Sequence, residues 1–149
     1  MTPRSVCVLH ESDGKWAVAM RAAAGDLPMR ETRSPERWLD HFRASPASIL
    51  ALAAPEGGDA LRYARLLEGA AYLQRHFPAM RWVALLTEQD RRLAPTAYEA
   101  GAVWVQVGRW RLDPLMRLMR RHQAQFPDPP AETPIDSIWR SLPWGDHPE

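Results

Sequence analysis

Five short apolar segments alternate along this chain with segments of helical spacing. The apolar segments are residues 5–11, 28–33, 48–54, 80–87 and 102–108. Between and after them, apolar residues recur three and four positions apart, as they do on one face of a helix. Strands that alternate with helices build βαβ units, in which the strands lie parallel and helices cover both faces. We therefore predict an α/β fold, a three-layer α/β/α sandwich around a five-stranded parallel sheet.

The predicted strands differ in how far we expect them to be buried. Residues 48–54 (SILALAA) are apolar almost throughout, which is typical of a central strand in a parallel sheet. Residues 28–33 begin with Pro28 and include Arg30 and Arg33, so this segment is predicted to be an edge strand.

The helical segments lie within residues 13–25, 34–45, 57–78, 88–101 and 112–126. Ser34 and Asp113 each precede a proline, a combination that predicts the N-terminal caps of the second and last helices. Gly25 and Gly101 are predicted to end their helices, because glycine readily adopts the left-handed conformation that commonly terminates a helix.

The composition is that of one folded domain and excludes several classes of protein. A chain of 149 residues, 46% hydrophobic and 25% charged, can bury a substantial core. No apolar run approaches the roughly 20 residues of a membrane span. The N-terminus lacks the features of a secretory signal, so we expect a cytoplasmic protein with no membrane partner. The net charge of +1 argues against a nucleic-acid partner for the whole surface. Cys7, the single cysteine, is interpreted as a buried hydrophobe rather than a nucleophile.

The character of the chain changes after residue 126. Four prolines fall within residues 127–136, a density that excludes regular helix or an inner strand. We therefore divide the chain into an α/β domain, residues 1–126, and a Pro-rich linker and tail, residues 127–149. The tail carries aliphatic and aromatic side chains that are costly to leave in water. Two interpretations stay open: the tail packs on the domain, or it docks on another protein.

Two motifs within residues 5–126 resemble those of response-regulator receiver domains. The segment YEAGAVWVQV contains Ala100, Gly101 and Ala102, which match the Ala-Gly-Ala that many receivers carry before the fifth strand. The segment WVALLTEQD ends its predicted strand in Thr87, where receivers have Thr or Ser. The resemblance implies a flavodoxin-like, CheY-like fold with the strand order 2-1-3-4-5.

The residues that carry the chemistry of receivers are replaced here. The resemblance aligns His10 and Glu11 with the acidic pair that holds magnesium, and Ala53, within residues 52–54, with the phospho-accepting Asp. Gly108 stands where receivers have a lysine. Phosphoryl transfer to a carboxylate needs a nucleophile, a divalent ion and a cation that balances the developing charge. The resemblance is therefore to a degenerate receiver, or pseudo-receiver.

This comparison leads to a functional hypothesis. We expect a non-catalytic, phosphorylation-independent receiver-like module of bacterial signalling that acts through contact with a protein partner and needs no cofactor or metal. Its interaction surface is predicted on the fourth helix, the fifth strand, the last helix and the tail, with the candidate residues Trp104, Trp110, Arg117, Arg120, Arg121, Ile138, Trp139, Leu142 and Trp144. A homodimer through the last helix and fifth strand stays open. DNA binding through the arginines of the last helix is a third hypothesis, although cations near a helix C-terminus also stabilise the helix itself.

The pocket at the strand ends supports a second hypothesis, a sensor of a small molecule, an anion or a nucleotide, or a cryptic enzyme. It would use His10, Glu11, Glu56 and Thr87, at the edge where doubly wound folds bind ligands. A metal site at His10 and Glu11 lacks a third ligand in the sequence, so we interpret this pair as a polar strand end. Thr87 is interpreted as the cap of a helix beginning at Glu88 rather than as an anion contact.

Overall fold

A computed structural model describes residues 5–126 of the chain, apart from the side chain of Glu56. The strands are β1 (Cys7–His10), β2 (Met29–Thr32), β3 (Ile49–Ala53), β4 (Arg81–Leu86) and β5 (Trp104–Val107). The α-helices are α1 (Lys15–Ala23), α2 (Trp38–Ala44), α3 (Ala60–His76), α4 (Ala94–Glu99) and α5 (Asp113–Gln125). Short 3-10 helices, η1 (Pro35–Arg37), η2 (Glu56–Gly58) and η3 (Glu88–Leu93), precede α2, α3 and α4.

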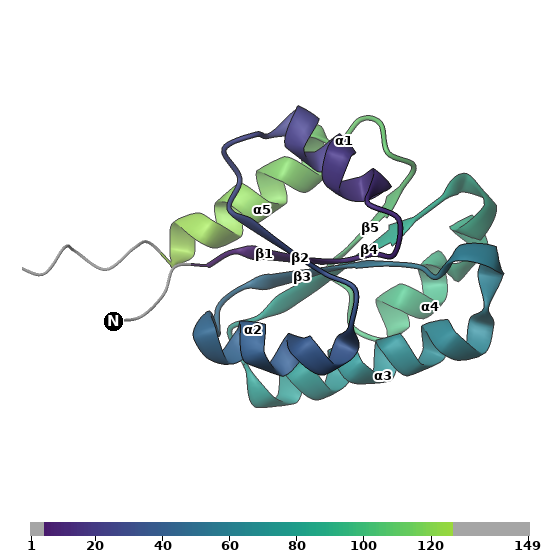
Figure 1. Ribbon diagram of the computed structural model, residues 1–149, viewed down its shortest axis with the longest axis horizontal. Helices are drawn as coiled ribbons and strands as arrows, with labels where there is room; N and C mark the ends of the chain where they lie inside the picture. Colours follow the sequence, from purple (N-terminus) through teal and green to yellow (C-terminus); the bar gives the residue numbers. More distant parts are fainter. Residues whose placement is uncertain (1–4, 127–149) are drawn as a thin grey trace, which may run out of the picture.

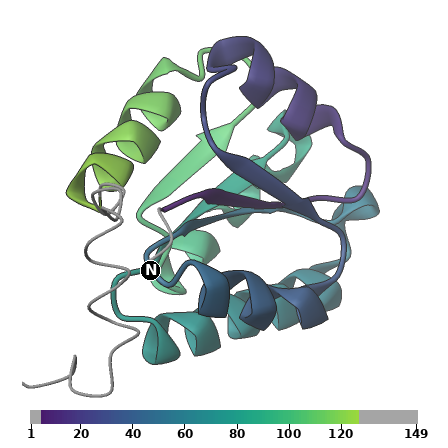
Figure 2. The same ribbon diagram turned by 60° about the vertical axis from the view of Figure 1, so that its left-hand side comes forward.

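The five strands form one parallel sheet in the order β2-β1-β3-β4-β5, as predicted. Helices α1 and α5 cover one face of this sheet, and α2, α3 and α4 cover the other (Figure 1). The turned view in Figure 2 separates the three layers, with the strands between the two groups of helices. The predicted three-layer α/β/α sandwich is therefore confirmed.

Burial follows the position of each strand in the sheet. All residues of the central strand β3 are buried, because helices pack against both of its faces. Along the edge strand β2 only Thr32 is buried, which agrees with the prediction for residues 28–33. The other edge strand, β5, is half-buried, and Gln106 is its one buried residue. The sequence thus predicted the strands, and it predicted the depth of β2 and β3.

Two apolar clusters fill the spaces on either side of the sheet. The larger one joins α2, α3 and α4 to the sheet and includes Trp38, Phe42, Tyr63 and Trp82. The smaller one joins α1 and α5 to the sheet and includes Trp16 and Cys7. Burial raises the pKa of the Cys7 thiol to about 12, so the thiol stays protonated and packs as a hydrophobe.

The helix ends differ from several sequence predictions. Asp113 is the first residue of α5, and the N-cap is Leu112, which offers no side-chain oxygen, so the predicted Asp113 cap is wrong. Ser34 does occupy the N-cap position, but of η1, and its hydroxyl donates to the Glu36 carboxylate instead of capping a backbone amide. Helix α1 ends at Ala23, with Ala24 as its C-cap and Gly25 beyond it.

Gly101 makes the turn between α4 and β5 that the sequence predicts. Its φ of +113° lies in the region that residues with a Cβ rarely adopt. A Cβ at this position would also lie 2.7 Å from Oε1 of Gln74. The backbone conformation therefore favours glycine here, and a Cβ would also require the end of the Gln74 side chain to move. Within residues 5–126, no helix is long and apolar enough to cross a membrane.

Candidate functional site

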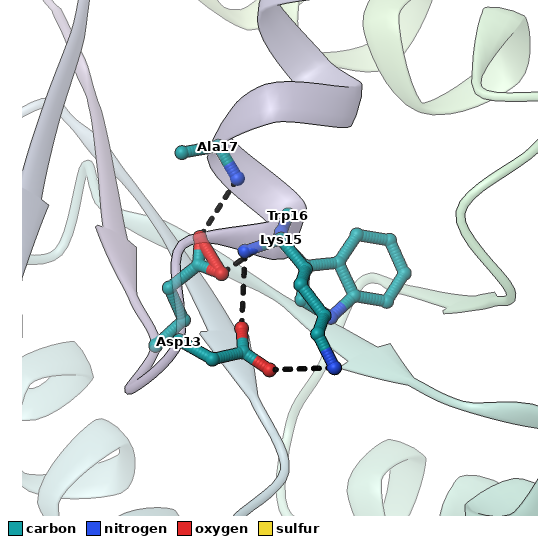
Figure 3. A network of polar contacts seen from close by, with 5 residues as sticks. Asp13, Lys15, Trp16 and Ala17 are labelled. Atoms are coloured by element: carbon teal, nitrogen blue, oxygen red, sulfur yellow. Dashed lines mark hydrogen bonds and ion pairs between the residues drawn. The ribbon is translucent and has the colours of Figure 1, made fainter.

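Glu11 follows β1 directly and turns its carboxylate toward the N-terminus of α1. Oε1 accepts a hydrogen bond from the backbone amide of Trp16 at 2.8 Å, and Oε2 accepts one from Ala17 at 2.7 Å. The N-cap residue of α1 is Gly14, which has no side chain to satisfy these amides. Figure 3 shows the amides of Trp16 and Ala17 with their hydrogen bonds at the start of the helix. The carboxylate that the receiver resemblance assigns to magnesium therefore caps a helix.

The environment of Glu11 combines burial with strong hydrogen bonding. Burial raises the pKa of its carboxyl above the usual range, and the nearby Asp13 acts in the same direction. The two backbone amides lower the pKa and partly offset these effects. Asp13 also accepts from the backbone amide of Lys15 at 3.0 Å and lies 3.6 Å from the Lys15 ammonium (Figure 3).

His10 lies on the face of the sheet opposite to Glu11. Its Nδ1 accepts a hydrogen bond from Nε1 of Trp38 at 3.2 Å, and the two rings meet edge to face. Burial, aided by the positive charge of Arg62, lowers the pKa of His10 to about 4. The ring is therefore neutral near pH 7. The structure does not bring His10 and Glu11 together as a ligand pair.

The end of β3 forms the floor of a pocket of about 630 Å³ at the carboxyl edge of the sheet. Ala53, Ala54 and Pro55 line it where the resemblance to receivers would place the reactive carboxylate. None of these side chains can accept a phosphoryl group. Glu56 begins η2, directly after this floor, and its side chain lies outside the described part of the structure.

The pocket wall carries charges of both signs. Three cations and three carboxylates line it: Lys15, Arg92, Arg109, Glu11, Asp13 and Asp90. Each of these carboxylates interacts with a protein group. Glu11 and Asp13 accept the backbone hydrogen bonds described above, and Asp90 accepts a hydrogen bond from the Thr87 hydroxyl at 3.0 Å. Arg92 and Arg109 have no hydrogen-bond or ion-pair partner among the side chains that the structure describes.

Thr87 occupies the N-cap position of η3, as predicted, but its side chain does not cap the helix backbone. The hydroxyl donates to Asp90 instead, while the Thr87 carbonyl accepts from the Asp90 amide at 3.0 Å. Thr87 lines the pocket together with Glu11. Two residues of the predicted strand-end pocket therefore meet there, and His10 does not.

The residues of this edge do not fit the magnesium ion that receivers use. Magnesium needs several oxygen ligands in nearly octahedral geometry. Glu11 directs both oxygens at backbone amides, and the side chains of Ala53 and Ala54 carry no oxygen that could replace it. No group of three or more His, Cys, Asp or Glu side chains within the described residues is arranged to hold a metal.

A loop with a preorganised shape joins β5 to α5. Gly108 adopts a φ of +85°, and the Trp110 indole folds over it so closely that a Cβ there would lie 3.2 Å from the ring. Buried Gln106 donates from Nε2 to the carbonyls of Gly108 at 3.2 Å and Trp110 at 3.3 Å. Trp110 is nevertheless 64% exposed. The loop therefore holds a large aromatic ring at the surface.

The other predicted surface residues have different surroundings. Trp104 is half-buried against the α1–α5 side of the sheet and donates to Oε1 of Gln106 at 3.3 Å. Arg117, Arg120 and Arg121 are exposed on α5, and Arg120 pairs with Asp26 at 3.2 Å. Ile138, Trp139, Leu142 and Trp144 lie outside the described residues.

Three features of the site escaped the sequence analysis. The cap formed by Glu11 had a sequence signal in Gly14, because a helix that begins after glycine needs an acceptor from elsewhere. Gln106 had a signal too, since it is the single polar residue within β5. The pocket cations Lys15, Arg92 and Arg109 come from three separate segments, the start of α1, η3 and the loop before α5, and no spacing in the sequence predicts their proximity.

Neither a protein-family model nor a curated protein sequence matches this chain. Several solved structures, in contrast, match this chain. A CheY-like protein (TadZ) from Pseudomonas aeruginosa matches 85% of this chain and 99% of its own, with a TM-score of 0.62 and 21% identity. A protein from Burkholderia thailandensis that is named for pilus assembly (CpaE) matches 83% of this chain and 100% of its own, with a TM-score of 0.57 and 22% identity.

NtrX from Brucella abortus, in a structure with ADP, matches 84% of this chain with a TM-score of 0.61 and 13% identity. The match spans only 27% of the NtrX chain. At these identities the comparisons establish the fold, which is the CheY-like receiver fold predicted from the two motifs.

Proposed function

We propose that this domain is a receiver-like signalling module that acts by contact with another protein and without phosphorylation of an aspartate. The observation that carries this proposal is the replacement of the chemical site by structural contacts. Glu11 caps α1, and the floor of the pocket consists of Ala53, Ala54 and Pro55.

A receiver transmits phosphorylation because a covalent mark at the strand ends changes the neighbouring surface. Without a nucleophile in the pocket floor, the same fold can still present a surface to a partner, and ordinary binding then supplies the signal. The exposed Trp110 supports a contact function, since aromatic residues that protrude from a rigid loop commonly anchor interfaces. The name of the Burkholderia relative makes pilus assembly one setting in which to seek a partner.

A challenge with acetyl phosphate and Mg²⁺ tests this function. We expect no gain of a phosphoryl group in the intact mass of the full chain, and no shift of amide signals around Ala53 and Thr87 on titration with Mg²⁺. A receiver domain with an intact acidic site serves as the positive control. A phosphoryl group attached to a carboxylate of this chain would contradict the proposal.

The pocket favours one second candidate, a sensor of a small anion or nucleotide. Arg92 and Arg109 line it without a partner among the described side chains, and Lys15 adds a third cation. A thermal-shift screen with phosphate, nucleotides and other anions tests it. Stabilisation by one anion that disappears in Arg92→Gln and persists in Arg65→Gln, a control on the exposed side of α3, would favour the sensor.

The tail belongs to the contact hypothesis but lies outside the described residues. The double variant Trp139→Ala with Trp144→Ala separates its two interpretations. A tail that docks on a partner predicts weaker capture of that partner with cooperative unfolding retained. A tail that belongs to the core predicts a large loss of stability.

A further inference from the structure

The two edges of the sheet differ in their protection against another strand. Edge strand β2 carries the charged residues Arg30 and Glu31 and follows Pro28, and such residues discourage further pairing. Edge strand β5 has the sequence Trp-Val-Gln-Val, with no charge and no proline. Among the described residues it pairs with β4 alone. The β5 edge is therefore open to a further strand.

The backbone of β5 offers hydrogen-bonding groups at this edge. The Gly108 amide, directly after the strand, donates to the Leu86 carbonyl of β4 at 2.8 Å, and the register pairs Leu86 with Val107. Because successive residues of a strand direct their amides to opposite sides, the peptide groups of Trp104 and Gln106 face β4 together with that of Gly108, whereas those of Val105 and Val107 face away from it. An added strand could pair with Val105 and Val107.

A groove of about 520 Å³ follows this edge. All of β5 lines it, with Glu88 and Arg91 of η3 on one side and Trp110, Arg111 and Pro114 on the other. Its length along β5 corresponds to roughly 13 Å of extended chain. The groove thus combines an unpaired strand with side chains on both sides.

Trp110 is an anchor that needs little ordering on binding. Gln106 holds the loop through its two hydrogen bonds, and Gly108 leaves room for the indole. The ring also lines a second, smaller depression with Trp16 and Thr87. A ring that is held in place before binding loses little conformational entropy, which favours a high contribution to affinity.

The charges around the groove favour an acidic occupant. Arg91 is paired with Glu88 at 2.6 Å, so these two charges compensate each other. Arg111, with a φ of 55°, and the neighbouring Arg109 have no ion-pair partner among the described side chains. The rim therefore keeps a net positive charge next to the exposed indole.

We propose that β5 binds an extended acidic peptide segment of a protein partner, which adds to the sheet as a sixth strand and packs against Trp110. This inference deepens the contact function proposed above and rests on it. Strand addition supplies affinity through main-chain hydrogen bonds, and the groove and its cations supply selectivity.

Selection from a library of displayed random dodecapeptides on the full chain identifies the probe. We expect the recovered peptides to be rich in Asp and Glu and to lack proline at their centre. Their acidic residues should alternate with β-branched or aromatic residues. Recovery of peptides with helical spacing, of Pro-x-x-Pro peptides or of basic peptides would overturn the proposal.

Amide hydrogen exchange with a selected peptide then distinguishes strand addition from other contacts. The amides of Val105 and Val107 should exchange at least tenfold more slowly on saturation, while that of Gly108, already bonded to β4, should change little. Protection confined to α4 or α5 would overturn the proposal and leave the contact function intact. Phosphorylation of a carboxylate, by contrast, would overturn the contact function.

Variants locate the anchor and the charge. Trp110→Ala should weaken peptide binding at least tenfold, whereas Tyr72→Ala, which removes an exposed aromatic residue of α3, should not change it. Arg111→Glu should weaken binding more than Arg65→Glu on α3. Equal effects within either pair would contradict the proposal.

The free full chain tests the two other occupants. A dimer in sedimentation, with the Val105 and Val107 amides protected at its interface, would assign the groove to a second copy. Protection in the monomer that disappears when residues 127–149 are removed would assign it to the tail. Either result would overturn the assignment to a partner peptide.

Discussion

The carboxylate of Glu11 accepts the backbone amide of Trp16 at 2.8 Å, five residues ahead in the chain. With its second bond, to Ala17, it takes the place of the side chain that Gly14 lacks at the N-cap of α1. A residue that the receiver resemblance assigns to metal binding thus contributes to the stability of a helix.

Glu11→Ala should lower the free energy of unfolding by about 1–2 kcal/mol, because it removes the acceptor of two helix amides. Glu11→Gln should have a smaller effect, since one acceptor oxygen remains. Urea unfolding measures both. The control is Glu31→Ala, which removes an exposed ion pair with Arg21 and should cost less than about 1 kcal/mol. Equal losses for Glu11→Ala and Glu31→Ala would contradict the capping role.

The neutral His10 should make stability depend on pH. Its pKa in the folded protein is lowered to about 4, so the unfolded chain takes up a proton first as the pH falls. The stability that the protein gains from keeping His10 neutral is complete at pH values above the ordinary histidine pKa of 6.5, and it is lost as the pH falls toward 4. In His10→Gln, which keeps an acceptor for Trp38, stability should therefore fall less steeply over this range.

Urea unfolding at several pH values tests the His10 prediction. The pKa values of His41 and His122 are also lowered by burial, but both residues are present in the wild type and in His10→Gln. The difference between the two proteins therefore isolates His10. Parallel stability curves from pH 7 to pH 4.5 would show that His10 is not the titrating group.

Gly101→Ala should destabilise the protein by about 1–2 kcal/mol, because a residue with a Cβ is strained at positive φ. The new methyl group would also approach Gln74. Gly25→Ala is the matched control, since no neighbour lies closer than 3.4 Å to a Cβ there. Thermal or urea unfolding of the two variants should separate them clearly, and similar stabilities would argue against the turn described here.

Gln106→Leu should release the loop that carries Trp110 while the apolar core stays intact. Two hydrogen bonds to the carbonyls of Gly108 and Trp110 disappear, at a cost of about 1–3 kcal/mol for the buried groups. Fluorine NMR of protein labelled with 5-fluorotryptophan should then show a narrower, more mobile signal for Trp110. An unchanged signal would mean that the Gln106 side chain does not hold the loop.

The sequence predicted the fold well because burial acts on whole segments. An all-apolar segment such as β3 has few alternatives to a central strand. Gly101 indicates the turn between α4 and β5 because of its backbone conformation alone. Both signals are local and do not depend on where distant residues lie.

The directions of polar side chains were harder to predict. Asp113 is a residue type that commonly caps helices, but it is the first helical residue of α5. Glu11, in contrast, caps α1 although it precedes the N-cap position of that helix. Likewise, adjacent residues of a strand point to opposite faces, which separates His10 from Glu11. Such details depend on three-dimensional directions that residue types and spacing do not specify.

The most direct measurement of the central claim is the intact mass of the full chain purified from its native cells under conditions that preserve acyl phosphates. We predict a single unphosphorylated species that still captures its partner, with capture reduced by Trp110→Ala. A population that carries a phosphoryl group on a carboxylate at the strand ends, and that alone binds the partner, would contradict the account.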